Sequence, residues 1–234
     1  MIFGLTDSLI FPPPYLARED GLLAIGGDLS VERLLLAYGQ GIFPWYTEED
    51  PILWWAPDPR LVLEPKKFHL PKRLARIIRQ GRFRVTFDTC FAQLIRACSL
   101  PRAGKERGTW LVPEMIEAYI RLHEAGYAHS VECWQGETLA GGLYGVAIGR
   151  VFFGESMFSR VSNSSKVALA HLVNLLQQWE FALIDCQMTT SHLMSLGARE
   201  MPGYEFYSRL EKHIPLSGRE GPWTEALTKK NAAS

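Results

Sequence analysis

Two polar side chains near the end of an apolar run are the first candidates for chemistry. The segment 181–187 reads Phe-Ala-Leu-Ile-Asp-Cys-Gln, which places Asp185 and Gln187 two positions apart. Such a run predicts a buried strand, and side chains two residues apart in a strand point to the same face, so we expect these two to leave the sheet together. Burying a carboxylate costs free energy unless it is hydrogen-bonded, so Asp185 is either tied into a structural network or kept for use in catalysis.

A third candidate, Glu155, ends an apolar strand. Residues 143–148 form an apolar run that reaches a turn at 149–150 and returns over 151–156, which predicts an antiparallel hairpin. From the residues alone, a salt bridge at the strand end is one interpretation of this carboxylate. Because residues 142–187 contain all three candidates, we expect the chemistry to lie there.

The elements that must position these side chains form one α+β unit. Polar residues 162–165 predict the N-cap of a helix over 166–179, which has apolar residues at helical spacing. Upstream, a helix that opens at Pro113 leads into strands over 128–134 and 138–147. The predicted order is therefore helix, three antiparallel strands, helix, strand.

The composition indicates a folded globular protein. The chain has 234 residues, of which 47% are hydrophobic and 21% charged, enough for one large or two small domains. The N-terminal residues do not resemble a signal peptide and no apolar run approaches the ~20 residues of a membrane span, so we expect a cytoplasmic protein without a membrane partner. The four cysteines form no Cys-x-x-Cys pair, so neither a zinc site nor a disulfide framework is expected.

Positive charge is concentrated in one segment, although the formal net charge is zero. A helix that begins at Pro71 and stops at Gly81 would carry Lys72, Arg76 and Arg79 on the face opposite its apolar residues. An ordinary solvated face mixes charges of both signs, whereas this segment contains no acid, which favours an anionic partner such as RNA. The eight cations of the segment are Lys66, Lys67, Lys72, Arg73, Arg76, Arg79, Arg82 and Arg84.

Proline-flanked tryptophans precede the basic segment. We expect Trp54 and Trp55 to be core residues, and Trp45 to be the better candidate for stacking on a base. Ser30 predicts the N-cap of a helix that ends near Tyr38.

A polar loop over 99–108 divides the chain into two expected parts. The first is an N-terminal lobe over 1–100 and the second a catalytic domain over 101–234. The lobe contains the basic helix, followed by a strand over 83–87 and a helix capped by Asp88.

The order of elements is similar to the centre of an acyl-CoA N-acyltransferase-like (GNAT) fold, which implies a mostly antiparallel sheet in the C-terminal domain. Where acetyltransferases of that fold hold coenzyme A with a glycine-rich loop, this chain has residues 160–165, Arg-Val-Ser-Asn-Ser-Ser. The residues themselves resemble the leucyl/phenylalanyl-tRNA–protein transferase family from about Phe11 to Pro202. The motifs that carry the resemblance are 21–28 (GLLAIGGD), 41–45 (GIFPW), 51–60 (PILWWAPDPR), 108–110 (GTW), 154–159 (GESMFS) and 184–187 (IDCQ).

This resemblance implies transfer of Leu, Phe or, less well, Met from aminoacyl-tRNA to proteins that begin with Arg or Lys, which marks them for N-degron (N-end rule) degradation. No cofactor is expected, because an aminoacyl ester is already activated. We expect the enzyme to work as a monomer. Two alternatives stay open: an acetyl-CoA-dependent N-acetyltransferase on the same fold, and a non-catalytic RNA-binding module.

The resemblance also implies roles for single residues. Asp185 and Gln187 match a proposed proton relay, in which the aspartate acts as a base or only orients the attacking amine, and Glu155 matches an acid that holds polar groups of the substrate. The implied pocket for the donor side chain consists of Leu143, Phe152, Leu172, Leu176 and Ile184. The residues implied to contact the tRNA are Trp45 and Trp110 at the terminal adenosine and Lys72, Arg73, Arg76 and Arg79 at the backbone.

Overall fold

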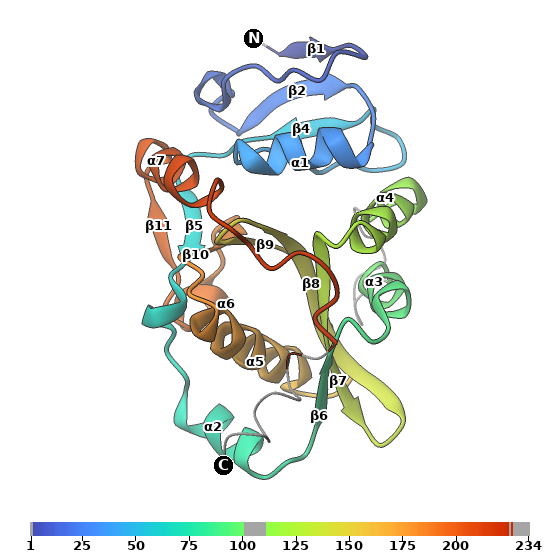
Figure 1. Cartoon of the computed structure of the whole chain (residues 1–234), viewed down its shortest axis with the longest axis vertical. Coiled ribbons are helices and arrows are strands. Elements are labelled where there is room, and N and C mark those ends of the chain that lie inside the picture. Colours follow the sequence, from blue (N-terminus) through green and yellow to red (C-terminus); the bar gives the residue numbers. More distant parts are fainter. Residues whose placement is uncertain (1, 101–110, 225, 227–234) are drawn as a thin grey trace.

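The computed structural model describes residues 2–100, 111–224 and 226. Its strands form two sheets, a small one built from N-terminal residues and a large one that makes up most of the body (Figure 1). In the described residues no helix is both long and apolar enough to cross a membrane.

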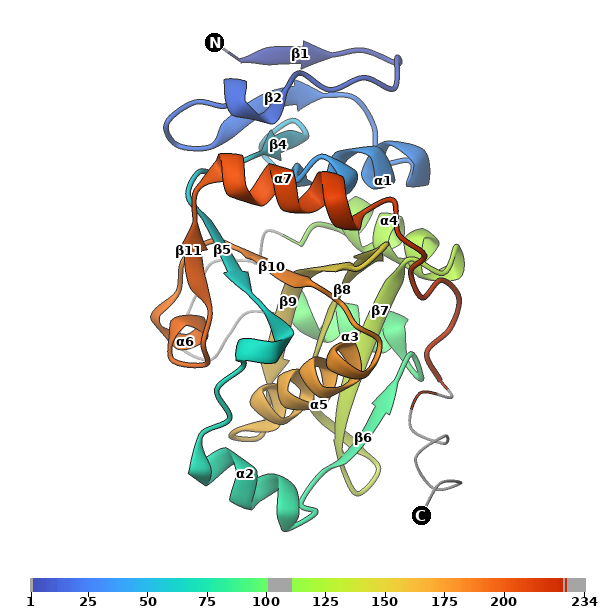
Figure 2. The same ribbon diagram turned by 60° about the vertical axis from the view of Figure 1, so that its left-hand side comes forward.

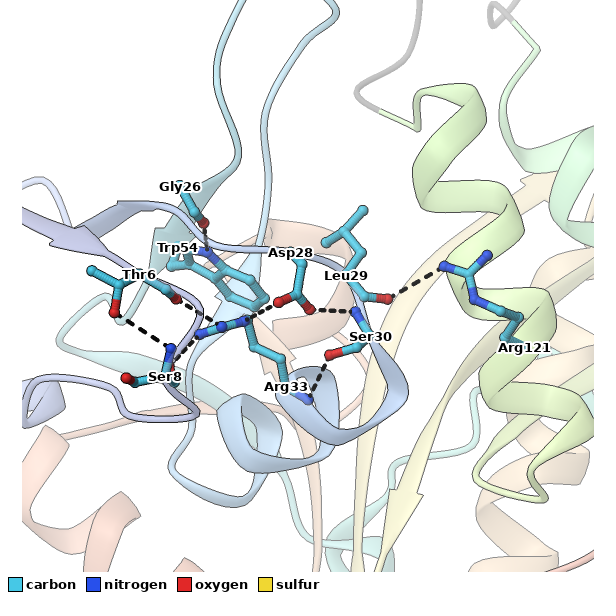
Figure 3. Close-up of polar contacts among 9 residues, drawn as sticks. All are labelled: Thr6, Ser8, Gly26, Asp28, Leu29, Ser30, Arg33, Trp54 and Arg121. Atoms are coloured by element: carbon cyan, nitrogen blue, oxygen red, sulfur yellow. Dashed lines mark hydrogen bonds and ion pairs between the residues drawn. The ribbon is translucent and has the colours of Figure 1, made fainter.

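The small sheet has four strands and is covered by one helix, α1 (Val31–Gly39). Ser30 caps α1 as predicted, because its hydroxyl accepts a hydrogen bond from the Arg33 amide at 3.3 Å. Trp54 is fully buried as predicted, and its indole N–H donates to the Gly26 carbonyl (Figure 3). In spatial order the strands are β1 (Phe3–Leu5), β2 (Leu22–Gly26), β4 (Leu53–Trp55) and β3 (Phe43–Pro44), with β1 and β2 parallel and the other neighbours antiparallel.

The large sheet has seven strands, and all of its neighbouring pairs are antiparallel except β9 with β10. The mostly antiparallel sheet expected for the C-terminal domain is therefore confirmed. In spatial order the strands are β11 (Arg199–Met201), β5 (Arg60–Leu63), β10 (Leu183–Gln187), β9 (Val151–Ser159), β8 (Thr138–Ile148), β7 (Ala128–Gln135) and β6 (Arg84–Phe87).

The predicted order of elements is also confirmed. Helix α4 (Pro113–Glu124) leads into β7, β8 and β9, and α5 (Ser164–Gln178) then connects β9 to β10. Because a parallel pair needs a crossover connection, α5 must pass over one face of the sheet. Glu155 lies within β9 rather than at its end, because that strand continues to Ser159.

Helices cover both faces of the large sheet (Figures 1 and 2). On one face α5 packs in a core with Leu143 and Phe152, while α3 (Phe91–Cys98) and α4 pack on the other face in a core with Tyr144 and Phe153. The alternation of neighbouring residues between the two cores follows from the two-residue period of a strand. The remaining helices are α2 (Lys72–Arg79), α6 (Ser191–Met194), α7 (Gly203–His213) and the short 3₁₀ helices η1 (Pro14–Leu16) and η2 (Pro65–Lys67).

The strands change sheets between Trp55 and Arg60, because β5 and β6 already belong to the large sheet. The boundary expected in the loop 99–108 falls mainly on residues 101–108, which lie outside the described residues, and the division after residue 100 stays a prediction.

Two local predictions need correction. Pro71 occupies the N-cap position of α2, whose first helical residue is Lys72. Asp88 does not cap α3, which begins three residues later; its carboxylate instead accepts hydrogen bonds from the backbone amides of Ser130 and Trp223, both at 2.8 Å. These partners lie far away in the sequence, so the local pattern gave no sign of them.

Candidate active site

A cavity of about 1190 Å³ opens between strands β8, β9 and β10, helix α5 and the small sheet. Its wall is mainly apolar. Four of the five residues expected to hold a donor side chain line it, and these are Leu143, Phe152, Leu172 and Ile184. The fifth, Leu176, is fully buried in the same core, whereas Leu169, about two turns earlier in α5, does line the cavity.

The Glu155 carboxylate faces this cavity and is held by two hydrogen bonds. Gln187 donates from its side-chain amide at 2.7 Å, and the Tyr119 hydroxyl donates at 2.8 Å. Tyr119 is itself hydrogen-bonded to Tyr38, and both tyrosines are buried. Burial raises the pKa of Tyr119 well above its usual value, so its hydroxyl stays protonated and donates.

Burial raises the pKa of Glu155 to about 7, with a further contribution from the nearby charge of Asp185, while its hydrogen bonds act in the opposite direction. A carboxyl with such a pKa exchanges a proton readily near neutral pH, which is the property required of a general acid or base. Among the described residues that line the cavity, Glu155 is the only acid.

Asp185 is fully buried and does not line the cavity. Its carboxylate forms a two-pronged ion pair with Arg60, at 2.9 Å from Nε to Oδ1 and 2.8 Å from Nη2 to Oδ2. Oδ1 also accepts the backbone N–H of Gln187 at 2.8 Å. Asp185 is thus saturated with donors, as expected for a buried carboxylate.

The expectation that Asp185 and Gln187 leave the sheet on one face is wrong. The register of β10 on β5 shifts between these two residues, and Gln187 has a positive φ of 62°. Because this irregularity breaks the two-residue period, the cavity is lined by Gln187 together with Ile184 and Cys186, while Asp185 points to Arg60. The two residues are still joined, through the backbone N–H of Gln187.

Trp45, the predicted stacking residue, lies at the cavity and is 37% exposed. Its ring meets Trp55 edge to face at 5.4 Å, and the Trp55 indole N–H donates to the Trp45 carbonyl at 2.6 Å. These two contacts fix the orientation of the Trp45 ring. Trp110 lies outside the described residues.

The predicted basic helix is α2, which packs on α5 through Leu74 and Ile77. Its four cations are exposed, and none of them forms an ion pair with a carboxylate in the part of the chain that the structure describes; they are Lys72, Arg73, Arg76 and Arg79. This helix lies beneath α5, at the end of the molecule opposite the small sheet (Figure 1).

The sequence did not single out several residues of the site. Tyr38 marked only the expected end of a helix, Tyr119 lies on the apolar side of the helix that opens at Pro113, and Arg60 was only the last residue of a motif. Three cationic or titratable side chains, Arg160, Lys166 and His192, also line the cavity, and burial together with Lys166 lowers the pKa of His192. No group of three or more His, Cys, Asp or Glu side chains in the described residues is arranged to hold a metal ion.

Solved structures similar to this one include a GCN5-related N-acetyltransferase from Kribbella flavida, which has a TM-score of 0.37, 11% identity and coverage of 71% of this chain and 59% of that chain. Another is L-PGS from Bacillus licheniformis, with a TM-score of 0.38, 10% identity and coverage of 84% of this chain and 65% of that chain.

Sequence relatives are much more similar. A transferase from Syntrophobacter fumaroxidans named leucyl/phenylalanyl-tRNA–protein transferase is 60% identical over 92% of both chains. A protein of the same name from Desulfatibacillum aliphaticivorans is 56% identical over 95% of this chain and 96% of its own. The family profile described as leucyl/phenylalanyl-tRNA protein transferase matches residues 62–211, and the profile of its N-terminal domain matches residues 27–58. The chain belongs to the leucyl/phenylalanyl-tRNA protein transferase family.

Proposed function

We propose that this protein transfers Leu, Phe and, less well, Met from aminoacyl-tRNA to the N-terminal Arg or Lys of acceptor proteins, which marks them for N-degron degradation. Its high identity to transferases of that name over nearly their whole length supports this proposal. The single observation that carries it in the structure is the apolar cavity with Glu155 and Gln187 in its wall. The enzyme acts as a monomer in the cytoplasm.

In this proposal the donor side chain enters the cavity beside Leu143, Phe152, Leu172 and Ile184. A γ-branched Leu or a planar Phe is favoured over β-branched Val or Ile by shape, although each methylene difference is worth only ~1–3 kcal/mol. Trp45, and Trp110 by its place in the family motif, stack on the terminal adenosine of the tRNA. The cations of α2 contact its phosphates.

The reaction forms one bond and breaks one. The acceptor α-amine attacks the ester carbonyl carbon, a C–N bond forms, and the C–O bond to the terminal ribose then breaks. The amine loses one proton and the ribose oxygen gains one. Glu155 is the carboxyl that carries this proton, because its pKa of about 7 suits both transfers and its side chain faces the cavity.

Asp185 neither acts as the base nor contacts the attacking amine; it orients Gln187, which lines the cavity. The oxygens of Asp185 are occupied by Arg60 and by the Gln187 amide, and this carboxylate has no exposed surface from which to accept a proton. Because the ester is already activated, orientation and proton transfer account for the rest of the chemistry.

The test is the transfer of labelled Phe from Phe-tRNA to a protein that begins with Arg. We expect labelling of that protein, much less labelling from Val-tRNA, and none when the acceptor's α-amine is acetylated. Acetyl transfer from acetyl-CoA without Phe transfer would overturn the proposal in favour of an acetyltransferase. Binding of tRNA without any transfer would overturn it in favour of an RNA-binding module.

A further inference from the structure

Arg60 lies near the cavity and has several polar and aromatic partners, although its side chain is not part of the cavity wall. It is the first residue of β5 and is 1% exposed. Besides the two bonds to Asp185, its Nη2 donates to the carbonyl of Gly41 at 2.7 Å. Its guanidinium carbon lies 4.9 Å from the ring centre of Phe43 and 4.8 Å from that of Phe206.

These partners come from four separate parts of the fold. Gly41 lies in the turn before β3, Phe43 in β3 of the small sheet, and Asp185 in β10 of the large sheet. Phe206 belongs to α7, which lies at the junction of the two sheets (Figure 2). The packing there is tight, since a Cβ added to Gly41 would lie 2.7 Å from the Phe206 ring, and Gly41 has a φ of +76°. The guanidinium is therefore fixed in both plane and direction.

The contacts of Arg60 continue to the cavity through a short series of hydrogen bonds. The same Asp185 oxygen that accepts Arg60 Nε also accepts the backbone N–H of Gln187. This bond holds Gln187 in the left-handed region, which is unfavourable for any residue but glycine. From that conformation the Gln187 side chain reaches Glu155.

We propose that Arg60 is a positioning residue of the transfer reaction. Through Asp185 it fixes the irregularity of β10 between Asp185 and Gln187, and this irregularity directs the side-chain amide of Gln187 onto Glu155. This inference rests on the proposed function. Lysine cannot replace arginine there, because a single ammonium group does not present two parallel N–H donors to both oxygens of Asp185. The Arg60→Lys change keeps the positive charge but removes the paired hydrogen bonds to the two oxygens of Asp185.

The first test compares Arg60→Lys with wild type in the Phe transfer assay. We expect kcat to fall about 100-fold, as for an active-site group that is displaced by about 1 Å, with the KM for Phe-tRNA within about twofold of wild type. The midpoint of the rise of kcat with pH should move to higher pH, because Glu155 loses the hydrogen bond that stabilises its charged form.

Arg33→Lys is the matched control. Arg33 is also fully buried, and it donates to the Asp28 carboxylate and to the carbonyls of Thr6 and Ser8, away from the cavity (Figure 3). This variant should lose stability but keep kcat per folded molecule and the pH midpoint. If Arg60→Lys changes kcat no more than Arg33→Lys does, the positioning role is wrong.

A double-mutant cycle with Asp185→Asn shows whether Arg60 acts through that residue. The double variant should be no slower than Asp185→Asn alone, whereas losses that multiply would overturn the proposed route. If Arg60→Lys does not fold, Phe206→Leu is used in its place, because it keeps the ion pair and loosens only one face of the guanidinium; a kcat and pH midpoint equal to wild type would then count against the proposal.

A readout without substrate separates this inference from the proposed function. The ¹³C NMR signal of the Glu155 carboxyl should titrate at higher pH in Arg60→Lys than in wild type. An unchanged midpoint would refute the positioning role whether or not transfer occurs. A shifted midpoint in a protein that transfers no Phe would refute only the proposed function.

Discussion

The carboxylates of Glu155 and Asp185 belong to one hydrogen-bond network but have different surroundings. Glu155 is half-buried and its partners Tyr119 and Gln187 are neutral, so burial dominates and its pKa rises. Asp185 is fully buried but faces the positive charge of Arg60. In many enzymes, different surroundings give two neighbouring carboxyl groups different roles, so that one transfers a proton and the other positions a partner.

At this scale we predict that Glu155→Gln removes the rise of kcat near pH 7. A base with a pKa of about 7 is active when ionised, so the wild-type rate should increase as pH rises through about 7. The variant should be slower by roughly 10²- to 10⁴-fold at pH 8 and keep only the rise near pH 8 that comes from deprotonation of the acceptor α-amine. The measurement is single-turnover Phe transfer from pH 5.5 to 8.5. Glu124→Gln, which changes an exposed acid of α4, should behave as wild type.

The same substitution should affect stability in a pH-dependent way. The folded-state pKa of Glu155 lies above the ordinary 4.5, so the folded protein holds this proton more tightly, and its contribution to stability is lost as pH rises from about 4.5 through about 7. The melting temperature of Glu155→Gln relative to wild type should therefore increase from pH 5 to pH 8. A difference that does not vary with pH would contradict the raised pKa.

At the scale of elements, α5 connects the two ends of the proposed tRNA-binding path. Leu169 and Leu172 on this helix line the cavity, and α2 packs against it on the side away from the small sheet (Figure 1). The exposed cations of α2 are thus held at a fixed distance from the cavity by a rigid helix. This arrangement fits a ligand with a reactive end and a distant phosphate backbone.

We predict that reversing Lys72, Arg73 and Arg76 to Glu weakens tRNA binding and flattens its salt dependence. Each lost phosphate contact should reduce the slope of log affinity against log salt by about one, so the triple variant should lose about three. Filter binding or fluorescence titration from 50 to 300 mM salt, on the order of physiological ionic strength, measures this slope.

A control with the same change in net charge reverses three exposed cations that lie far apart in the sequence, Arg18, Arg96 and Lys212, of which the first two are paired with Asp20 and Glu117. It should lower affinity only slightly and leave the slope near that of wild type. Equal slopes for the two triple variants would mean that α2 is ordinary solvated surface.

At the scale of the whole molecule, the segment after α7 ties the structure together. Its Gly221 amide donates to the Gly126 carbonyl, and Trp223 ends in the core of the large sheet, 3% exposed. There the indole stacks on His129 at 3.7 Å, while the Trp223 amide donates to Asp88. The segment therefore crosses from α7 to the strands behind the cavity wall.

We predict that Trp223→Leu destabilises the fold by about 2–4 kcal/mol, since it removes a large buried ring and leaves a cavity. Urea unfolding followed by circular dichroism measures the change. Tyr204→Leu, which alters an aromatic side chain of α7 that is 78% exposed, should change stability by less than about 0.5 kcal/mol. Similar costs for the two variants would show that the segment contributes little to the core.

The sequence alone determined the features that depend on local pattern. The hairpin of β8 and β9, the cap of α1 by Ser30 and the exposed basic face of α2 were predictable, because capping and hydrophobic period act over a few residues. The family resemblance, followed position by position, likewise grouped Glu155 and Gln187 with four residues that line the cavity.

Only the tertiary structure decided which groups face one another. Arg60 and Asp185 are 125 positions apart and meet because β5 pairs with β10, and Asp88 meets Trp223 across 135 positions. The irregularity of β10 between Asp185 and Gln187 could not be predicted either, because the two-residue alternation of side chains assumes a regular strand. Pairings of this kind depend on how sheets and helices pack as a whole, and that information is distributed over the entire chain rather than contained in any one segment.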